Sequence, residues 1–323
     1  MKVVITRKIP DRIKQLLDNE CTTYMWNEEL EPMPRDLLLQ QIADADALFT
    51  NVSDRIDKEV FQAASKLKVV STMAVGFDNI DIEEATRRGI LVGHTPDVLS
   101  EAVADLTFAL ILATARKIFE GMNYIKDGCW RGWGPMLLTG QNVYNATLGI
   151  IGMGRIGKKV ARRATGFDMK ILYHNRNRRK ELEQELGAQY RPLDDLLRSS
   201  DIIVMLAPAT PETYRMIGKR EFSIMKPNAI FINTSRGSNV DESALITALK
   251  ERQIWGAGLD VFEKEPISPE HPLLSLENVV VLPHIGSATL ETRINMAMIT
   301  AQNILHGLRG EPLLHCVNPR VVT

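Results

Sequence analysis

Short apolar runs alternate with stretches of helical spacing along nearly the whole chain. In the first hundred residues, four apolar or β-branched runs predict strands at 3–6, 45–50, 67–72 and 90–95. Helical spacing predicts helices at 11–19 and 82–89, the second with Gly89 as its C-terminal cap. This alternation is typical of parallel α/β architecture. It predicts one small α/β domain.

A second series begins near Ser100. One long helix is predicted over 100–122, followed by a Trp- and Gly-rich loop over 129–142. Strands are then predicted at 146–152, 169–174, 201–206, 228–233, 254–262 and 278–284. Six strands separated by helices predict a doubly wound sheet of the Rossmann type.

The last helix is predicted near 289–309. Because the first domain has no terminal helix of its own, we expect this helix to return and pack on it. The prediction is therefore α/β with two parallel-sheet domains. Residues 1–99 plus 288–323 form a flavodoxin-like substrate-binding domain, and residues 100–287 form an inserted dinucleotide-binding Rossmann domain.

Composition narrows the class of protein. The 323 residues are 45% hydrophobic and carry a net charge of −1, which gives no reason to expect nucleic acid or an anionic membrane as a partner. Three separated cysteines favour neither a disulfide framework nor a thiolate metal site, and they fit a reducing cytoplasm. The longest apolar run, 102–115, contains Asp105 and is too short to cross a bilayer. We expect a cytoplasmic protein.

A glycine motif follows the first strand of the second domain. Gly152, Gly154 and Gly157 form G-x-G-x-x-G between an apolar strand and a predicted helix. Such a loop turns tightly, lets the backbone approach a diphosphate, and points the N–H groups of the helix N-terminus at it. An ordinary structural turn is the alternative, but the strand–turn–helix context favours dinucleotide binding.

The choice of cofactor is expected at the end of the next strand. An acid that binds the ribose 2′-hydroxyl would stand about 20 residues beyond the glycines, and this chain has Asn175 and Arg176 there, with Arg178 close by. Arginines form charge-assisted hydrogen bonds with a 2′-phosphate. A solvated basic helix start is the alternative. The sequence therefore predicts NADP(H) as the preferred cofactor, with NAD(H) as the alternative.

Several further motifs resemble one enzyme family. The segments INTSRGSNVDESAL (232–245), GLDVFEKEP (258–266), PHIGSAT (283–289), MAVGFDNID (73–81) and TPDVLSEAVADLTFAL (95–110) and the VNP tail (317–319) are similar to those of the D-isomer-specific 2-hydroxyacid dehydrogenases. They occur in order and cover nearly the whole chain. The pattern is nearest to the glyoxylate and hydroxypyruvate reductases, some of which also reduce 2-oxogluconate.

The resemblance implies a catalytic triad of Arg236, Glu265 and His284. A guanidinium suits the carboxylate and ketone of a 2-oxo acid, and an imidazolium suits proton donation to the carbonyl oxygen. Glu265 would orient His284 and keep its pKa high enough to hold that proton. Glu263 competes for the acid role, but the Glu-Pro step matches the family at Glu265.

The resemblance also implies contacts with the cofactor and the substrate. Backbone N–H groups of Val75 and Gly76 would bind the substrate carboxylate, and Asp260 would hold the nicotinamide carboxamide. Beyond the residues already named, the expected cofactor contacts are Arg155, Ile156, Pro208, Thr234, Ser235, Arg236, His284 and Gly286. The other histidines (His94, His174, His271, His306 and His315) have no ligand spacing, so they are interpreted as structural and no metal is predicted.

The Trp-rich loop points to a second copy of the chain. Exposed Trp130, Trp133 and Met136 would favour burial against another subunit, which predicts a homodimer. In the similar reductases a loop tryptophan, here Trp133, reaches the partner's active site and limits substrate size. An anchor for the dimer interface is the equal alternative. The chain departs from the family before the Rossmann strand, where Asn145 would have to adopt the left-handed conformation of a glycine.

Two other functions share the fold. A nicotinamide-sensing transcriptional corepressor can keep the triad, although the chain has neither a long disordered tail nor a basic excess. A phosphonate dehydrogenase has a lysine in the segment where this chain has Ala74-Val75-Gly76. The leading hypothesis is NADPH-dependent reduction of a small 2-oxo acid to the D-2-hydroxy acid.

Overall fold

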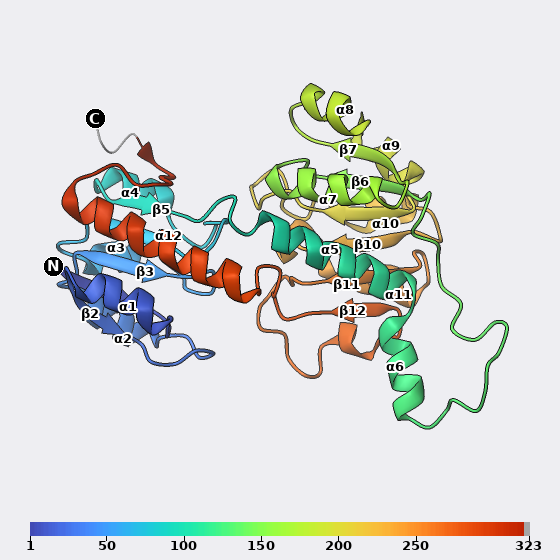
Figure 1. Ribbon diagram of the computed structural model, residues 1–323, viewed down its shortest axis with the longest axis horizontal. Helices are drawn as coiled ribbons and strands as arrows, with labels where there is room; N and C mark the ends of the chain where they lie inside the picture. The colour runs from blue at the N-terminus through green and yellow to red at the C-terminus, as the bar shows by residue number, and fades with distance from the viewer. Residues whose placement is uncertain (320–323) are drawn as a thin grey trace. The chain divides into compact units, whose positions relative to one another are not determined.

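The computed structural model describes residues 1–319, and the chain forms two compact units (Figure 1). One unit comprises Met1–Leu99 and the C-terminal segment that starts at Ser287; the other is Ser100–Gly286. Residues 320–323, which the sequence prediction assigns to the first domain, lie outside the described residues. Along residues 1–319, no helix is both long and apolar enough to cross a membrane.

The first unit is built on a parallel sheet with the strand order β2-β1-β3-β4-β5. Its strands are β1 (Lys2–Ile5), β2 (Thr22–Met25), β3 (Ala47–Thr50), β4 (Val69–Thr72) and β5 (Leu91–Gly93). Its helices are α1 (Asp11–Asp18), α2 (Arg35–Ile42), α3 (Lys58–Ala63), α4 (Ile82–Arg87) and α12 (Leu290–Arg309). The sequence pattern missed β2, because this strand lies at the sheet edge and is half-exposed.

Successive residues of β1 belong to opposite faces of this sheet, as the twofold period of a strand requires. Val4 lies in the core that α2, α3 and α4 cover. Val3 and Ile5 lie in the core that α1 and α12 cover, so α12 supplies part of one face of the first unit. Helix α12 begins after the cap Thr289 and ends at Gly310 in the left-handed conformation.

The second unit is a parallel sheet with the order β12-β11-β10-β9-β6-β7-β8. Its strands are β6 (Thr147–Ile151), β7 (Lys170–His174), β8 (Gln189–Tyr190), β9 (Ile202–Met205), β10 (Ile230–Asn233), β11 (Gly256–Leu259) and β12 (Val279–Val281). Seven strands are thus described where the pattern predicted six, because the edge strand β8 has only two residues. The order reverses between β6 and β9, the place where doubly wound sheets bind ligands.

Helices cover both faces of this sheet (Figure 1). One face carries α5 (Ser100–Ala115), α7 (Arg155–Thr165) and α8 (Lys180–Leu186). The other carries α9 (Leu193–Ser199), α10 (Lys219–Ile224) and α11 (Glu242–Lys250). Short 3₁₀ turns, η1 (Gly237–Asn239) and η2 (Pro272–Ser275), complete the unit.

The single helix predicted over 100–122 is wrong. The chain leaves α5 at Lys117, whose φ is +52°, and starts a separate helix α6 (Ile118–Lys126) with no buried residue. The carbonyl of Ala115 accepts the N–H of Gln141 at 2.8 Å instead of continuing the helix. A hydrogen bond from a loop that comes later in the chain therefore ends α5, and the sequence around α5 does not indicate this contact.

Candidate active site

The glycine loop has the geometry that a tight strand-to-helix turn needs. Gly152 has φ +102°, and a Cβ there would lie 2.4 Å from the Ala207 nitrogen. A Cβ on Gly157 would lie 2.5 Å from the Gly152 carbonyl oxygen, so α7 packs against β6 only with glycine at this position. A Cβ on Gly154 would meet no atom within 4 Å. The space in front of Gly154 is open to a ligand.

The N-terminus of α7 fits an anionic group. Gly154 is its N-cap and offers no side-chain oxygen to the first N–H groups of the helix. These donors and the positive end of an 11-residue helix face the open space beside Gly154. The residues present therefore suit the diphosphate of a dinucleotide. Arg155 and Ile156, both expected to contact the cofactor, form the first turn of α7.

Asn175 secures the glycine loop from the neighbouring strand. Its side-chain oxygen accepts the N–H of Met153 at 2.6 Å, and its amide nitrogen lies 3.4 Å from the Met153 carbonyl oxygen. An amide makes both contacts, whereas a carboxylate has no donor for the carbonyl. Asn175 thus lies where the sequence predicted, directly after β7, and it braces the turn between β6 and α7.

The two arginines after β7 differ in their surroundings. Arg178 forms a bidentate ion pair with Glu183, with Nε and one terminal nitrogen 2.6 and 2.7 Å from the two carboxylate oxygens. Together with the Tyr173 hydroxyl, this pair lowers the pKa of Glu183 to about 2. Arg176 is exposed. The hydrogen bond with the Thr210 side chain lowers the pKa of Glu212 most, the Glu212 backbone contributes next, and the charge of Arg176 adds to the lowering. Arg176 is therefore the better placed of the two to meet an added phosphate.

Arg236 follows β10 in a turn that Asn233 holds. The Asn233 side chain donates to the Arg236 carbonyl at 2.9 Å and accepts from the N–H and hydroxyl of Ser235. At Gly237 a Cβ would come within 1.9 Å of the Phe262 carbonyl carbon, so this turn lies directly against the backbone that leads to Glu265. The turn therefore brings Arg236 and the segment after β11 to the same place.

Glu265 and His284 form a hydrogen-bonded pair. Oε2 of Glu265 lies 2.7 Å from Nδ1 of His284, while Oε1 accepts the Phe262 N–H at 3.0 Å. Burial raises the pKa of Glu265, but the hydrogen bond and charge of His284, the Phe262 N–H and the charge of Arg236 outweigh it, so this pKa lies below its usual range. Glu263 is paired elsewhere, with Arg215 at 2.6 Å. The geometry thus joins Glu265, not Glu263, to His284.

Asp260 organises the turn that carries His284. It directly follows β11 and is 1% exposed, and its two carboxylate oxygens accept the N–H groups of Ile285 and Gly286, each at 2.7 Å. Burial raises the pKa of Asp260 to about 6 against these hydrogen bonds and the charge of His284. His284 itself has φ +54°, which is unusual for a residue with a Cβ. The motif placed Asp260 near the site, but this bracing role had no sequence signal.

The other predicted contacts of the second unit line the same edge. Thr234 is buried and shares a hydrogen bond of 2.9 Å with Thr107 of α5, whereas Pro208, after β9, is exposed. In a parallel sheet all strands end at one edge. The glycine loop, Arg236, Asp260 and His284 follow β6, β10, β11 and β12, respectively, so they share the carboxyl edge of one sheet.

Three residues that are predicted to contact the substrate do not follow a strand of this sheet. Val75 and Gly76 belong to the first unit, in the loop after β4. Trp133 belongs to the second unit and is 86% exposed in the loop after α6.

Asn145 has φ +58°, so the left-handed conformation expected at this departure from the family is confirmed. No group of His, Cys, Asp and Glu side chains suited to a metal occurs within residues 1–319.

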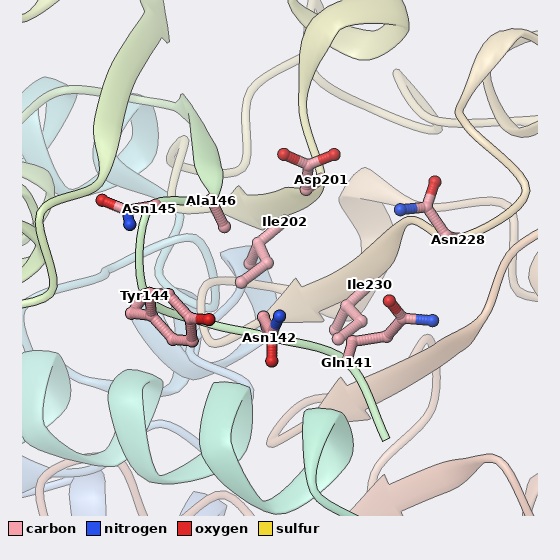
Figure 2. A pocket seen from close by; sticks show the side chains of 9 residues that line it. All are labelled: Gln141, Asn142, Tyr144, Asn145, Ala146, Asp201, Ile202, Asn228 and Ile230. Atoms are coloured by element: carbon pink, nitrogen blue, oxygen red, sulfur yellow. The ribbon is translucent and has the colours of Figure 1, made fainter. Parts of the chain in front are cut away.

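A cavity of about 230 Å³ opens at the other edge of the same sheet (Figure 2). It is lined by Gln141, Asn142, Tyr144, Asn145, Ala146, Asp201, Ile202, Asn228 and Ile230. The carboxylate of Asp201 is already engaged by Lys226 at 2.8 Å and by the Thr147 N–H at 2.9 Å. These residues stand at the amino ends of β6, β9 and β10, so the cavity is no part of the candidate active site.

Comparison with known proteins decides the family. Residues 108–286 match the family described as D-isomer specific 2-hydroxyacid dehydrogenase, NAD binding domain. The chain is 50% identical over 325 aligned positions to the glyoxylate reductase of Pyrococcus horikoshii, covering 99% of this chain and 97% of that enzyme. The chain belongs to the D-isomer-specific 2-hydroxyacid dehydrogenases. It is therefore an NAD(P)-dependent oxidoreductase.

Solved structures of similar proteins agree with the two-sheet fold. A protein from Thermus thermophilus has a TM-score of 0.91 at 42% identity and covers 98% of this chain and all of its own. A second structure is that of an NADPH-dependent glyoxylate/hydroxypyruvate reductase from Sinorhizobium meliloti in complex with NADP and malonate. It has a TM-score of 0.86 at 33% identity, and the match covers 98% of this chain and 96% of the reductase. The predicted α/β class with two parallel sheets is confirmed.

Proposed function

We propose that this dehydrogenase reduces glyoxylate and hydroxypyruvate to the corresponding 2-hydroxy acids with NADPH. The observation that carries the proposal is the Glu265–His284 pair, 2.7 Å apart at the sheet edge that also bears the glycine loop and Arg236. Relatives named glyoxylate reductase, 50% identical over nearly their full length, support this substrate class.

The proposed chemistry divides among three side chains. Arg236 binds the substrate carboxylate and polarises the adjoining ketone through charge-assisted hydrogen bonds. Because Nδ1 of His284 is bonded to Glu265, Nε2 is the nitrogen that donates a proton to the carbonyl oxygen. Glu265 fixes the imidazole ring and balances its positive charge. When bound, the reduced nicotinamide supplies the hydride to the carbonyl carbon.

The first unit would contribute the remaining carboxylate contacts. We assign the N–H groups of Val75 and Gly76 to the substrate carboxylate, so that the unit carrying them is the substrate-binding domain. The second unit is the dinucleotide-binding domain, with Arg176 as the residue that binds the 2′-phosphate. Asp260 is assigned to the nicotinamide carboxamide as well as to the turn after His284.

A substrate panel tests the proposed function. Purified enzyme is mixed with glyoxylate, hydroxypyruvate, 2-oxogluconate or pyruvate and with each reduced cofactor, and the loss of absorbance at the nicotinamide band is followed. We expect the highest kcat/KM with NADPH and either glyoxylate or hydroxypyruvate. Absence of turnover with every 2-oxo acid would favour a nicotinamide-sensing corepressor, and reduction of the oxidised cofactor by phosphite would favour a phosphonate dehydrogenase.

We also propose that the enzyme is a homodimer held by α6 and the loop after it. Exposed apolar side chains gather on this segment: Ile118, Phe119, Met122, Ile125, Trp130, Trp133, Met136 and Leu137. Ile118, Met122 and Ile125 recur at helical spacing on α6, so they form one apolar stripe. A stripe of this kind suits burial against a second copy.

Replacing Ile125 with aspartate is expected to shift the enzyme from twice the 36.2 kDa chain mass to a single chain mass in sedimentation velocity. The charge would have to be buried without a partner in the interface. Leu30→Asp is the control, since Leu30 is 90% exposed but lies in the other unit. A wild-type monomer would refute the proposal.

Trp133→Ala separates the two roles of Trp133: a changed substrate preference in an intact dimer indicates contact with the partner's site, and dissociation indicates an anchor.

A further inference from the structure

The loop after β4 is held by two consecutive residues that follow β5. The backbone N–H of Thr95 donates to the Ala74 carbonyl at 2.8 Å. Nδ1 of His94 lies 2.9 Å from the Val75 carbonyl oxygen. A carbonyl only accepts hydrogen bonds, so Nδ1 must carry the proton in this contact. The carbonyls of Ala74 and Val75 are thereby anchored within the first unit.

These anchors determine where the next two N–H groups point. The C=O of Ala74 shares a planar trans peptide with the N–H of Val75, and the C=O of Val75 shares one with the N–H of Gly76. In a trans peptide the N–H points opposite to the C=O. Anchoring both carbonyls to the segment after β5 therefore directs both N–H groups away from it, as a pair.

His94 is itself held firmly. Its N–H donates to the His315 carbonyl at 3.2 Å, and its carbonyl accepts from the Asn303 side chain at 3.2 Å. Its ring meets Phe77 edge-on, with centroids 5.5 Å apart. Asn303 is fully buried on α12. Its side chain can lie close to the backbone of residue 93 because that residue is glycine: a Cβ there would lie 2.8 Å from the amide nitrogen of Asn303. The donor that faces Val75 is thus fixed from its backbone and from its ring.

We propose that His94 is a positioning residue for substrate binding: its Nδ1–H holds the Val75–Gly76 peptide so that the Gly76 N–H is presented to the substrate carboxylate. This inference rests on the proposed function of the Val75–Gly76 loop. It gives a functional role to a histidine that the sequence alone marked as structural. Thr95 anchors its peptide through the backbone, so His94 is the anchor that a side-chain substitution removes.

The test compares three variants by steady-state kinetics with glyoxylate and NADPH. His94→Ala removes the donor, and we expect KM for glyoxylate to rise about tenfold with kcat and the KM for NADPH within about twofold, the signature of lost uniform binding. His94→Asn places an amide nitrogen on the same Cγ as Nδ1, so it should restore KM to within about threefold of the wild type. His306→Ala is the control, because its Nδ1 makes the same kind of contact with the Pro312 carbonyl at 3.0 Å elsewhere in the unit.

Oxalate provides a readout that does not require turnover. Its affinity for the wild-type enzyme mixed with NADPH, measured by calorimetry, should fall in His94→Ala and recover in His94→Asn. An unchanged KM and oxalate affinity in His94→Ala would overturn the inference. Equal losses in the Ala and Asn variants would also overturn it, because they would indicate packing against Phe77 instead of hydrogen bonding. A wild-type enzyme that binds oxalate but reduces no 2-oxo acid would instead contradict the proposed function.

Discussion

Replacing His284 with glutamine is expected to lower kcat for glyoxylate reduction by about 10²- to 10⁴-fold, the usual contribution of a general acid. Glutamine keeps a hydrogen-bond donor of similar reach but cannot give up a proton to the carbonyl oxygen. The KM for NADPH should stay within about threefold of the wild type, because the glycine loop and Arg176 follow β6 and β7, whereas His284 follows β12. Steady-state kinetics with varied NADPH and varied glyoxylate measure both quantities.

The chain supplies a matched control for this variant. His271 also pairs with a glutamate in the second unit, with Nε2 3.1 Å from Oε1 of Glu242. Its ring caps a 3₁₀ turn by accepting the Leu273 N–H, which is a structural task. His271→Gln should therefore leave kcat within about threefold of the wild type. Near-normal turnover in His284→Gln would remove the proposed mechanism.

The carboxylates around His284 set the pH range in which the site keeps its charges. The pKa of Glu265 is lowered, so Glu265 is ionised throughout the neutral range, and its pairing is lost only as the pH falls through that lowered pKa. Asp260 behaves in the opposite sense, because burial raises its pKa to about 6. Protonation near that pH weakens its acceptance of the Ile285 and Gly286 N–H groups. Of these two carboxylates, Asp260 is therefore the first to lose its charge as the solution becomes acidic.

Much of the fold was predictable because buried strands of a parallel sheet are continuous apolar runs. β6, β9 and β10 were found within one or two residues of their ends. β2 and β8 were missed because they lie at sheet edges and are short or half-exposed. The end of α5 was missed because it depends on the N–H of Gln141, which only the folded loop brings to Ala115.

The candidate site shows the same division. The glycine motif was predictable because it stands directly after an apolar strand, whereas Arg236, Glu265 and His284 were expected from the resemblance to the family. Their partners were not: nothing in the local pattern shows that Asp260 braces the turn after His284 or that His94 anchors Val75. Such contacts join segments that become neighbours only when parallel strands assemble side by side.

Replacing Arg176 with alanine is expected to lower kcat/KM for NADPH about 10- to 100-fold, because a hydrogen bond to a charged group contributes about 1.5–3 kcal/mol. The value for NADH should stay within about threefold of the wild type, because that cofactor has no 2′-phosphate. Initial rates with glyoxylate at saturating concentration and each cofactor varied give the ratio directly. The sequence favoured Arg176, which stands at the expected position, with Arg178 close by. The ion pair between Arg178 and Glu183 supports the same choice, because Arg178 is already engaged.

The double variant Arg178→Ala/Glu183→Gln is the control for this assignment. It removes the bidentate pair as a unit, so the net charge beside the cofactor site is unchanged, whereas Arg178→Ala alone would leave the Glu183 carboxylate without its counter-charge near a phosphate. We expect the double variant to keep NADPH preference to within about threefold, since exposed ion pairs contribute little. Loss of preference in the double variant, with none in Arg176→Ala, would move the phosphate contact to Arg178. A wild-type enzyme with higher kcat/KM for NADH than for NADPH would contradict a 2′-phosphate contact at either arginine.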